Sequence, residues 1–270
     1  MAPTRNTWRA GRFWWEPAHG AARPADPYPL QALVFDLDAL TDIECDGHRV
    51  VFNAAFAAHG LDIAWTPARY RRLLALHDER RRVAAELRAR GVCTECDVLL
   101  NLLADEIVDT KQMMFEEMIL AADLTPRPGL ADLVVEAFAE GISVAVVADG
   151  QRRWVEPLVR ELVGEGLVTT LVTADDLAEP MRPADGHRLA LADLWVPAGR
   201  VLAFTGSAHG LRTATAAGLA TVVVTGAGRP ELAGAAATRP DYAAPAPLRV
   251  EDCRELAANW WTGHKPLIAA

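Results

Sequence analysis

The sequence predicts an α/β protein that has a core with a parallel sheet, plus an inserted all-helical domain. Two patterns lead to this fold class. After residue 126, short apolar segments alternate with helical patterns, which is typical of a parallel sheet with helices on both faces. Between residues 44 and 122, glycines are few and Ala, Leu, Arg and Glu are frequent, which predicts a run of helices. A single apolar segment precedes this run, so we expect the helices to be inserted after the first strand.

The domain boundaries follow from these patterns. We expect the core at residues 31–43 and 126–270, and the helical insertion, a cap, at residues 44–125. The expected strands are Ala32–Phe35, Ser143–Val147, Val201–Phe204 and Ala220–Thr225. The expected helices are Gly47–His59, Pro67–Leu76, Glu79–Arg90, Asp97–Ala121, residues 130–140, Arg152–Val163 and Leu211–Ala217.

Both ends of the chain are rich in tryptophan. Residues 1–30 contain Trp8, Trp14 and Trp15 among prolines and arginines without periodicity, which predicts an extended arm. The stretch around Trp260 and Trp261 is similar. Because exposed tryptophans are unfavourable, we expect these segments to pack on the core of the chain itself or, alternatively, on a protein partner.

The composition excludes several classes of protein. The chain has 270 residues and a formal net charge of −9. This acidic balance argues against a nucleic-acid binder, which needs a basic surface to meet phosphates. No apolar run reaches the roughly 18 residues of a membrane span, and the first residues lack the apolar stretch of a secretory signal. We therefore expect a cytoplasmic protein without a nucleic-acid or membrane partner.

The cysteines do not predict a site. Cys45, Cys93, Cys96 and Cys253 are too few for a disulfide framework in a chain of this length. Cys93 and Cys96 have CxxC spacing, but no matching Cys or His pair follows for a structural zinc ion. We expect them to be ordinary residues at the start of a helix.

The stretch VFDLD, residues 34–38, places two carboxylates where the first strand is expected to end. Ligands of parallel α/β sheets bind at the carboxyl ends of the strands. Side chains two residues apart on extended backbone point the same way, so Asp36 and Asp38 are expected to face one site. One carboxylate can attack phosphorus, and the other can protonate the leaving oxygen and later activate water. Two solvated or capping carboxylates are the alternative interpretation.

Four stretches in order carry a family resemblance: VFDLD, ECDGHRVVFNAAFAAHGLD (44–62), RPGL (127–130) and GSAHGLRTATAAGLATVVVT (206–225). The chain resembles the haloacid dehalogenase (HAD) superfamily, in the phosphatase branch that contains the CbbY-like and β-phosphoglucomutase-like proteins. The resemblance implies a Rossmann-like HAD core with a helical cap and a small phosphorylated metabolite as the substrate. It also implies a nucleophile at Asp36, an acid/base at Asp38 and Mg²⁺ held by Asp36 and the Asp38 carbonyl.

The chain departs from the family pattern at each conserved motif. Ala39 stands for the glycine of DxDGT, and Ala148 for the hydroxyl residue that holds the phosphoryl group. Arg182 stands for the phosphate-binding lysine and keeps its charge. Thr205 and Gly206 replace the two acids that complete the metal site. Mg²⁺ usually rests on one or two carboxylates, so this last departure weakens the metal site most.

Further residues were assigned from their position. Asp149 follows Ala148 and is expected either to cap helix 152–163 or to replace a lost metal ligand. His48 and Arg49 match the substrate-facing start of the family's cap, where Arg49 could bind a second phosphate. The arginine runs at 69–72 and 80–82 could do the same, or form a solvated helical face.

Three functions remain open at this point. The first is a HAD-type phosphohydrolase, a hydrolase with impaired activity that works through an aspartyl-phosphate at Asp36. The second is a catalytically inactive relative that binds a metabolite or a protein partner. The third is a dehalogenase-like enzyme, in which the aspartate attacks carbon and needs no metal, although the DGHR start of the cap is more similar to phosphatases.

Overall fold

The computed structural model describes residues 29–263, except 77, 93–95, 179–181, 183 and 227–231. The described residues divide into two compact units, one formed by those up to residue 41 and from residue 125 onward, and the other by those between 42 and 124. The predicted arm at residues 1–30 falls almost entirely outside the described residues. Among the helices that the structure describes, none is long and apolar enough to cross a membrane.

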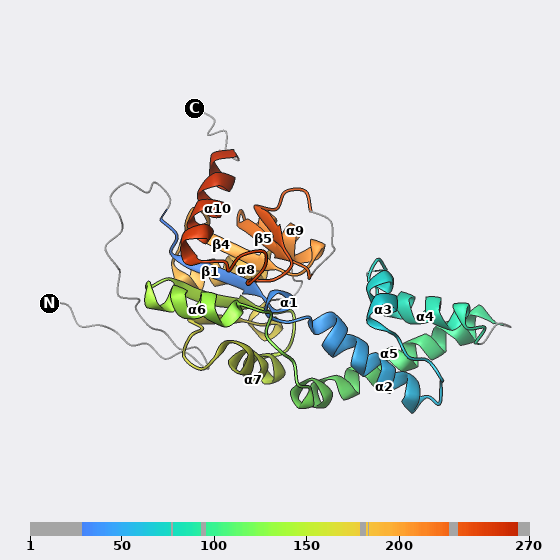
Figure 1. Cartoon of the computed structure of the whole chain (residues 1–270). Helices are drawn as coiled ribbons and strands as arrows, with labels where there is room; N and C mark the ends of the chain where they lie inside the picture. The colour runs from blue at the N-terminus through green and yellow to red at the C-terminus, as the bar shows by residue number, and fades with distance from the viewer. Residues whose placement is uncertain are drawn as a thin grey trace. The chain divides into compact units, whose positions relative to one another are not determined.

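The first unit is built on a six-stranded parallel sheet with the strand order β3-β2-β1-β4-β5-β6 (Figure 1). The strands are β1 (Ala32–Asp36), β2 (Ser143–Val147), β3 (Thr170–Val172), β4 (Val201–Thr205), β5 (Ala220–Val224) and β6 (Ala237–Arg239). The predicted parallel α/β core is therefore confirmed. The short outer strands β3 and β6 were not predicted, because three residues give no readable alternation.

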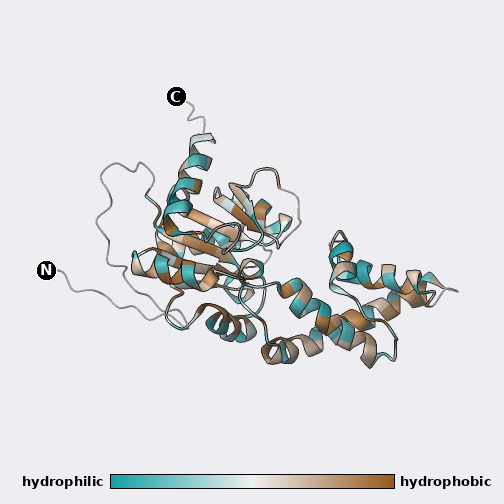
Figure 2. Cartoon of the chain, in the orientation of Figure 1, coloured by the Kyte–Doolittle hydropathy of each residue, from teal (hydrophilic) through white to brown (hydrophobic). Residues whose placement is uncertain are grey.

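The helices of the first unit cover both faces of the sheet (Figure 1). They are α1 (Leu37–Leu40), α6 (Leu130–Ala139), α7 (Arg152–Val163), α8 (Asp185–Leu194), α9 (Ala208–Ala216) and α10 (Val250–Gly263). On one face, Ala190 of α8 and Ala214 of α9 pack in a cluster with small strand residues such as Ala203. On the other face, the rings of Phe35 and Phe204 stack with centroids 4.7 Å apart. Figure 2 shows the strands mainly in brown, as expected for strands buried on both faces.

The C-terminal tryptophans belong to helix α10 rather than to an extended tail. The rings of Trp260 and Trp261 meet edge to face, with centroids 5.0 Å apart. The indole N–H of Trp260 donates to the Gly234 carbonyl of the first unit at 3.4 Å. These contacts agree with packing on the chain's own core, while the partner surface predicted for the tryptophans stays a prediction.

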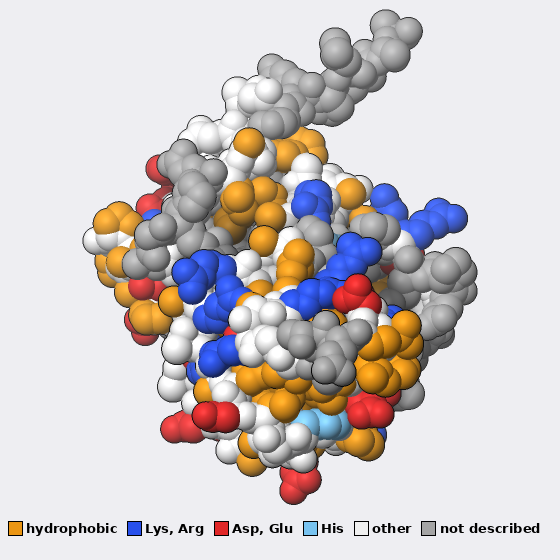
Figure 3. Space-filling view, turned by 90° about the vertical axis from the view of Figure 1, so that its right-hand side faces the viewer, with side chains coloured by type: hydrophobic (Ala, Val, Ile, Leu, Met, Phe, Trp, Pro, Cys, Tyr) orange, Lys and Arg blue, Asp and Glu red, His pale blue; other side chains and the backbone are white. Residues whose placement is uncertain are grey.

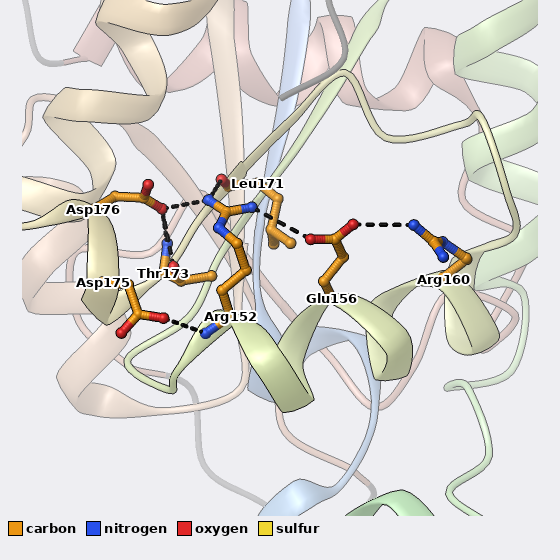
Figure 4. Close-up of polar contacts among 7 residues, drawn as sticks. All are labelled: Arg152, Glu156, Arg160, Leu171, Thr173, Asp175 and Asp176. Carbon is orange, nitrogen blue, oxygen red and sulfur yellow. Dashed lines mark hydrogen bonds and ion pairs between the residues drawn. The ribbon is translucent and has the colours of Figure 1, made fainter. Parts of the chain in front are cut away.

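Asp149 does not cap helix α7, contrary to one sequence expectation. The N-cap residue is Gln151, and its side chain makes no capping bond. Instead, Asp175 accepts a hydrogen bond from the Arg152 N–H at 2.7 Å (Figure 4). Asp175 lies in the short 3-10 helix that follows β3, Ala174–Asp176. The Arg152 guanidinium also pairs with Asp176. A segment far along the chain therefore supplies the cap, which sequence spacing does not reveal.

The second unit is helical and has its own core. A π-helical segment, Ile43–His48, leads into α2 (Arg49–Ala58), followed by α3 (Pro67–Leu73), α4 (Glu79–Ala89) and α5 (Asp97–Ala121). The predicted helices are all present, although the first begins earlier than Gly47. Aromatic side chains fill the interior, and Phe52, Trp65 and Tyr70 are fully buried. Thr66 and Asp78 cap α3 and α4 through side-chain bonds, as residues of this type commonly do.

A tight turn before α6 supports the segment that follows β1. Gly129 has φ +80°, and a Cβ atom there would lie 2.8 Å from both the Tyr242 carbonyl carbon and the Ala243 nitrogen. Tyr242 donates its N–H to Pro128 O at 2.9 Å and its hydroxyl to Ala39 O at 3.0 Å. Gly129 thus permits a close backbone approach that also holds the segment after β1.

We expect Gly129→Ala to destabilise the protein by more than about 2 kcal/mol, because left-handed strain adds to a backbone clash. Gly60 is the matched control, since it has φ +69° but nothing within 4 Å of a built Cβ. Gly60→Ala should therefore cost only the strain, about 1 kcal/mol. Unfolding midpoints in urea would measure both, and equal losses would contradict the role given to the Tyr242 contact.

Candidate active site

The two aspartates lie at the carboxyl end of the central strand β1. Asp36 is the last residue of β1, but Asp38 lies in the short helix α1 rather than on extended backbone. The sequence argument from alternating side chains is therefore wrong in its geometry. The two carboxylates are nevertheless close, because the charge of Asp36 affects the pKa of Asp38. A Cβ at Gly210 would lie 1.8 Å from Thr205 Oγ1 and 2.3 Å from Asp36 Oδ2, so only glycine fits there.

Asp36 is held by a histidine that the sequence analysis did not identify. Nε2 of His187, in α8, lies 2.9 Å from Asp36 Oδ1. The His187 side chain is only 4% exposed and that of Asp36 is 14% exposed. Because the pair is shielded from water, this contact fixes the carboxylate more strongly than a surface pair would. Of the two carboxylate oxygens, Oδ2 is the one without this contact.

Asp38 is held at both its side chain and its main chain. Its Oδ1 accepts a hydrogen bond from Gly206 N at 2.7 Å, and Thr205 Oγ1 lies 3.4 Å from the same oxygen. Its carbonyl oxygen accepts two bonds from the Arg127 guanidinium, from Nη2 at 2.8 Å and from Nε at 3.2 Å. Ser207 caps α9 by accepting from Gly210 N at 3.0 Å, which fixes the Gly206 turn.

The surroundings of Asp38 favour its protonated form. Burial, and then the negative charge of Asp36, raise the pKa of Asp38 to about 6. Hydrogen bonds from Gly206 and Ser207 and the charge of Arg127 oppose this rise. A carboxyl group with a pKa near the working pH can both donate and accept a proton, as a general acid/base requires.

The remaining core residues predicted for the site do not join this cluster. Ala148 is buried, and its N–H is used in a bond to Val172 O at 2.9 Å. Asp149 and Arg182 are exposed. The Arg182 N–H donates to Asp185 Oδ2 at 2.9 Å, at the start of α8. No interaction of the Asp149 carboxylate or the Arg182 guanidinium with Asp36 or Asp38 is found in the described structure, so their predicted roles stay predictions.

His48, one of the two residues predicted to face the substrate from the helical unit, is neutral in the folded chain. Burial, followed by the charges of Lys111 and Arg82, lowers the pKa of His48 to about 3. Its ring stacks on Phe115 with centroids 4.6 Å apart, and Nδ1 lies 3.7 Å from a Glu79 oxygen. At 24% side-chain exposure, His48 could offer a substrate a neutral N–H but no positive charge.

The Arg49 guanidinium donates hydrogen bonds to main-chain carbonyl groups of its own unit. Its Nε donates to Cys45 O at 2.7 Å, and its Nη1 donates to Trp65 O at 3.0 Å. Most of the arginines in the two runs also have partners within this unit. These pairs are Arg69–Glu86 at 2.7 Å, Arg71–Asp42 at 3.1 Å and Arg80–Asp105 at 2.6 Å, and Arg82 Nε donates to Leu76 O at 2.7 Å. Figure 3 shows basic side chains interspersed with acidic and hydrophobic ones, rather than a continuous basic surface.

The described residues do not fit a magnesium ion. Nowhere in the described part of the chain do three or more His, Cys, Asp or Glu residues form a group that could hold a metal ion. Asp36 Oδ1 is bonded to His187, and the Asp38 carbonyl is bonded to Arg127. A Cβ at Gly206, where the family has an acid, would lie 2.5 Å from the Asp38 carbonyl oxygen. The ligand set predicted from Asp36, Asp38 and Asp149 is therefore not assembled.

Comparisons with known proteins decide the family. No protein-family model matches the chain. Protein CbbY of Cereibacter sphaeroides is 34% identical over 200 residues, which cover 73% of this chain and 85% of that protein. Protein CbbY of Rhodobacter capsulatus is 31% identical, over 72% of this chain and 85% of that protein. The chain belongs to the CbbY family. The resemblance to CbbY-like HAD phosphatases that the sequence motifs indicated is thereby confirmed.

Solved structures of CbbY proteins have the same fold as this chain. The crystal structure of CbbY from Rhodobacter sphaeroides in complex with phosphate has a TM-score of 0.60 and 33% identity, over 81% of this chain and 97% of that one. A mutant of that CbbY in complex with xylulose-(1,5)bisphosphate has a TM-score of 0.59 and 32% identity, with the same coverage. A putative β-phosphoglucomutase from Thermotoga maritima, at 22% identity and a TM-score of 0.57, shares the fold.

Sequence reasoning missed two residues of this CbbY family site. Arg127 lies in the RPGL stretch that carried the resemblance, but the sequence does not show which oxygen the Arg127 guanidinium contacts. His187 follows Arg182 closely in the sequence and lies in the first turn of helix α8, which was not predicted. A helix there would have placed a histidine near the carboxyl ends of β1 and β2, which α8 contacts.

Cys93 of the CxxC pair lies outside the described residues, so that expectation is not tested.

Proposed function

We propose that this CbbY family member is a phosphatase for a small sugar phosphate. The observation that carries the proposal is the Asp36–Asp38 pair at the carboxyl end of β1, in a chain of this family. Asp36 leaves Oδ2 without the histidine contact, and Asp38 has a pKa of about 6. A fixed nucleophile beside a carboxyl group that can hold or release a proton is the arrangement that such a hydrolysis needs.

In the first step, the Asp36 carboxylate attacks the phosphorus atom, and the bond from phosphorus to the sugar oxygen breaks. Protonated Asp38 gives its proton to that oxygen, which leaves as a hydroxyl. In the second step, Asp38 takes a proton from water as the water oxygen attacks phosphorus. The bond to Asp36 breaks, and inorganic phosphate leaves with both aspartates restored.

The substrate class rests on the relatives. One CbbY structure is a complex with phosphate and another is a complex with xylulose-(1,5)bisphosphate. Arg49, the residue expected to bind a second phosphate, already donates to two carbonyl groups. We therefore propose a sugar phosphate as the substrate class and do not extend the proposal to a bisphosphate.

A non-catalytic binding protein is the second candidate. The loss of the family's two acids at Thr205 and Gly206 and of the hydroxyl at Ala148 favours it. Phosphoryl transfer depends on positioning and charge neutralisation, so these losses are expected to slow turnover. The slow phosphatase and the inactive relative make different predictions for the same assay.

The test is phosphate release by the purified full chain from a sugar monophosphate, a sugar bisphosphate and p-nitrophenyl phosphate. Asp36→Asn serves as the blank for each substrate. We expect slow release above the blank, with higher kcat/KM for a sugar phosphate than for the generic ester. Equal rates in the wild type and the blank with all three substrates would favour the binding protein.

A further inference from the structure

Side chains of the chain itself contact both groups that the family resemblance assigns to a divalent cation, the Asp36 carboxylate and the Asp38 carbonyl. Asp36 Oδ1 receives His187 Nε2 at 2.9 Å. The Asp38 carbonyl receives two N–H groups of Arg127, at 2.8 and 3.2 Å. Two donors on one carbonyl oxygen use both of its lone pairs, so a cation would have to displace the guanidinium.

The third position of a metal site is closed as well. Gly206 has no carboxylate, and its N–H instead donates to Asp38 Oδ1 at 2.7 Å. A Cβ at this residue would lie 2.5 Å from Asp38 O and 3.1 Å from Asp38 Cγ. The backbone of Asp38 therefore lies where an acidic side chain at residue 206 would have to begin. Replacing the glycine by aspartate would require this backbone to shift.

Burial makes the contact between His187 and Asp36 costly to break. His187 is 4% exposed and comes from α8, whose Ala190 packs in the cluster beneath the sheet. A polar ring nitrogen buried at this depth is costly to leave without a partner, so His187 is expected to keep its contact with Asp36. Tyr242 adds a bond from its hydroxyl to Ala39 O, next to the carbonyl that Arg127 binds. The turn after β1 is thus held from two sides.

We propose that His187 and Arg127 take the place of the divalent cation, so that the site positions its nucleophile without metal. His187 holds the Asp36 carboxylate through Oδ1, while Arg127 anchors the Asp38 main chain and adds positive charge beside the carboxylates. Both are positioning residues. This inference rests on the phosphatase activity proposed above, and its substrate class is a phosphate monoester.

The first experiment does not depend on activity. The melting temperature of the full chain is measured with MgCl₂, with NaCl at matched ionic strength and with EDTA. A ligand that binds only the folded form must raise the melting temperature. We expect the same value in all three conditions, and a rise specific to MgCl₂ would overturn the inference.

The second experiment measures phosphate release in EDTA and in MgCl₂, using the best substrate of the phosphatase screen. We expect equal kcat/KM in both, and a loss of activity in EDTA that Mg²⁺ restores would overturn the inference. If no phosphate is released in either condition, the proposed function fails. The melting temperatures still decide the question of the metal, so the two failures are distinguishable.

The third experiment tests His187 with a pair of variants. His187→Gln keeps an N–H donor, while His187→Leu fills the buried space without one. For His187→Leu we expect kcat to fall on the order of 100-fold with KM unchanged, because a misplaced nucleophile slows the chemical step. His187→Gln should recover part of the loss. Wild-type kcat in the folded leucine variant, or equal losses in both variants, would contradict the positioning role.

Discussion

Replacing Asp36 with asparagine is expected to abolish phosphate release, lowering kcat on the order of 10⁴-fold or more. The reason is chemical rather than structural. Asparagine keeps an oxygen that can accept the His187 contact at 2.9 Å, but its neutral amide cannot replace the carboxylate as the nucleophile. The fold around β1 should persist, and the nucleophile is lost. Phosphate release and circular dichroism on the same samples would measure the two effects separately.

The control for this variant is Asp132→Asn. Asp132 is an exposed aspartate in the first turn of α6, outside the candidate site. It removes one carboxylate from the same unit without touching Asp36 or Asp38. We expect its kcat to match the wild type. A residual rate in Asp36→Asn equal to that of Asp132→Asn would mean that phosphate release does not pass through Asp36.

Local sequence patterns predicted the core of this fold because its strands are buried. All five residues of β2, β4 and β5 are buried, so each strand appears as a continuous apolar run. The outer strand β6, by contrast, is only partly buried along its length. Three half-buried residues give neither an apolar run nor an alternation. The sequence therefore predicted the centre of the sheet and not its edges.

The sequence likewise predicted only part of the candidate site. Asp36 and Asp38 were predictable because their position depends on one strand and the residues that follow it. Their partners are not, because His187 and Arg127 come from a helix and a loop far along the chain. The helical turn at α1 was also missed, and it is held by the Tyr242 hydroxyl on Ala39 O. Contacts between segments that are far apart in the sequence determine the partners of each carboxylate, and local sequence patterns do not reveal such contacts.

The helical unit illustrates a different limit. The sequence indicated correctly that residues 44–122 are helical, and it offered Arg49 as a phosphate ligand. In the structure, Arg49 bridges the carbonyl groups of Cys45 and Trp65 instead. Arginine binds carbonyl and carboxylate oxygens as readily as phosphate, so its presence alone does not identify the acceptor. The alternative for the arginine runs was a solvated helical face, but Arg69 pairs instead with Glu86, whose side chain is only 3% exposed.

Asp38→Asn is expected to raise stability at neutral pH and to lower activity. In the folded chain, burial and the neighbouring Asp36 raise the pKa of Asp38 from 3.8 to about 6. Between these two values the folded state therefore holds more protons than the unfolded state. Stability from this group is highest at low pH and falls as the pH rises from about 4 to 6, the opposite of the usual salt-bridged aspartate.

The size of the effect follows from the same difference in pKa. About two pKa units at 1.36 kcal/mol each correspond to an unfavourable contribution of roughly 3 kcal/mol above pH 6. Asp38 keeps part of its surface exposed, and solvent screening reduces the contribution, so we expect about 1–2 kcal/mol. Asparagine can still accept the Gly206 bond at 2.7 Å but carries no charge to desolvate. The variant should thus be more stable than the wild type at pH 7.5 and equal to it near pH 4.

Urea unfolding of both proteins from pH 4 to pH 8 would measure this difference, with Asp132→Asn as the control that changes net charge alone. If the wild type and Asp38→Asn differ equally at every pH, the Asp38 carboxylate does not titrate in the predicted range.

Phosphate release by the same two proteins tests the role of Asp38 in the reaction, because asparagine can neither give a proton to the leaving oxygen nor take one from water. Wild-type activity should fall above pH 6 as Asp38 loses its proton, while Asp38→Asn should be nearly inactive at every pH. If removing this carboxylate makes the protein more stable, the charge of Asp38 serves the reaction and not the stability of the fold.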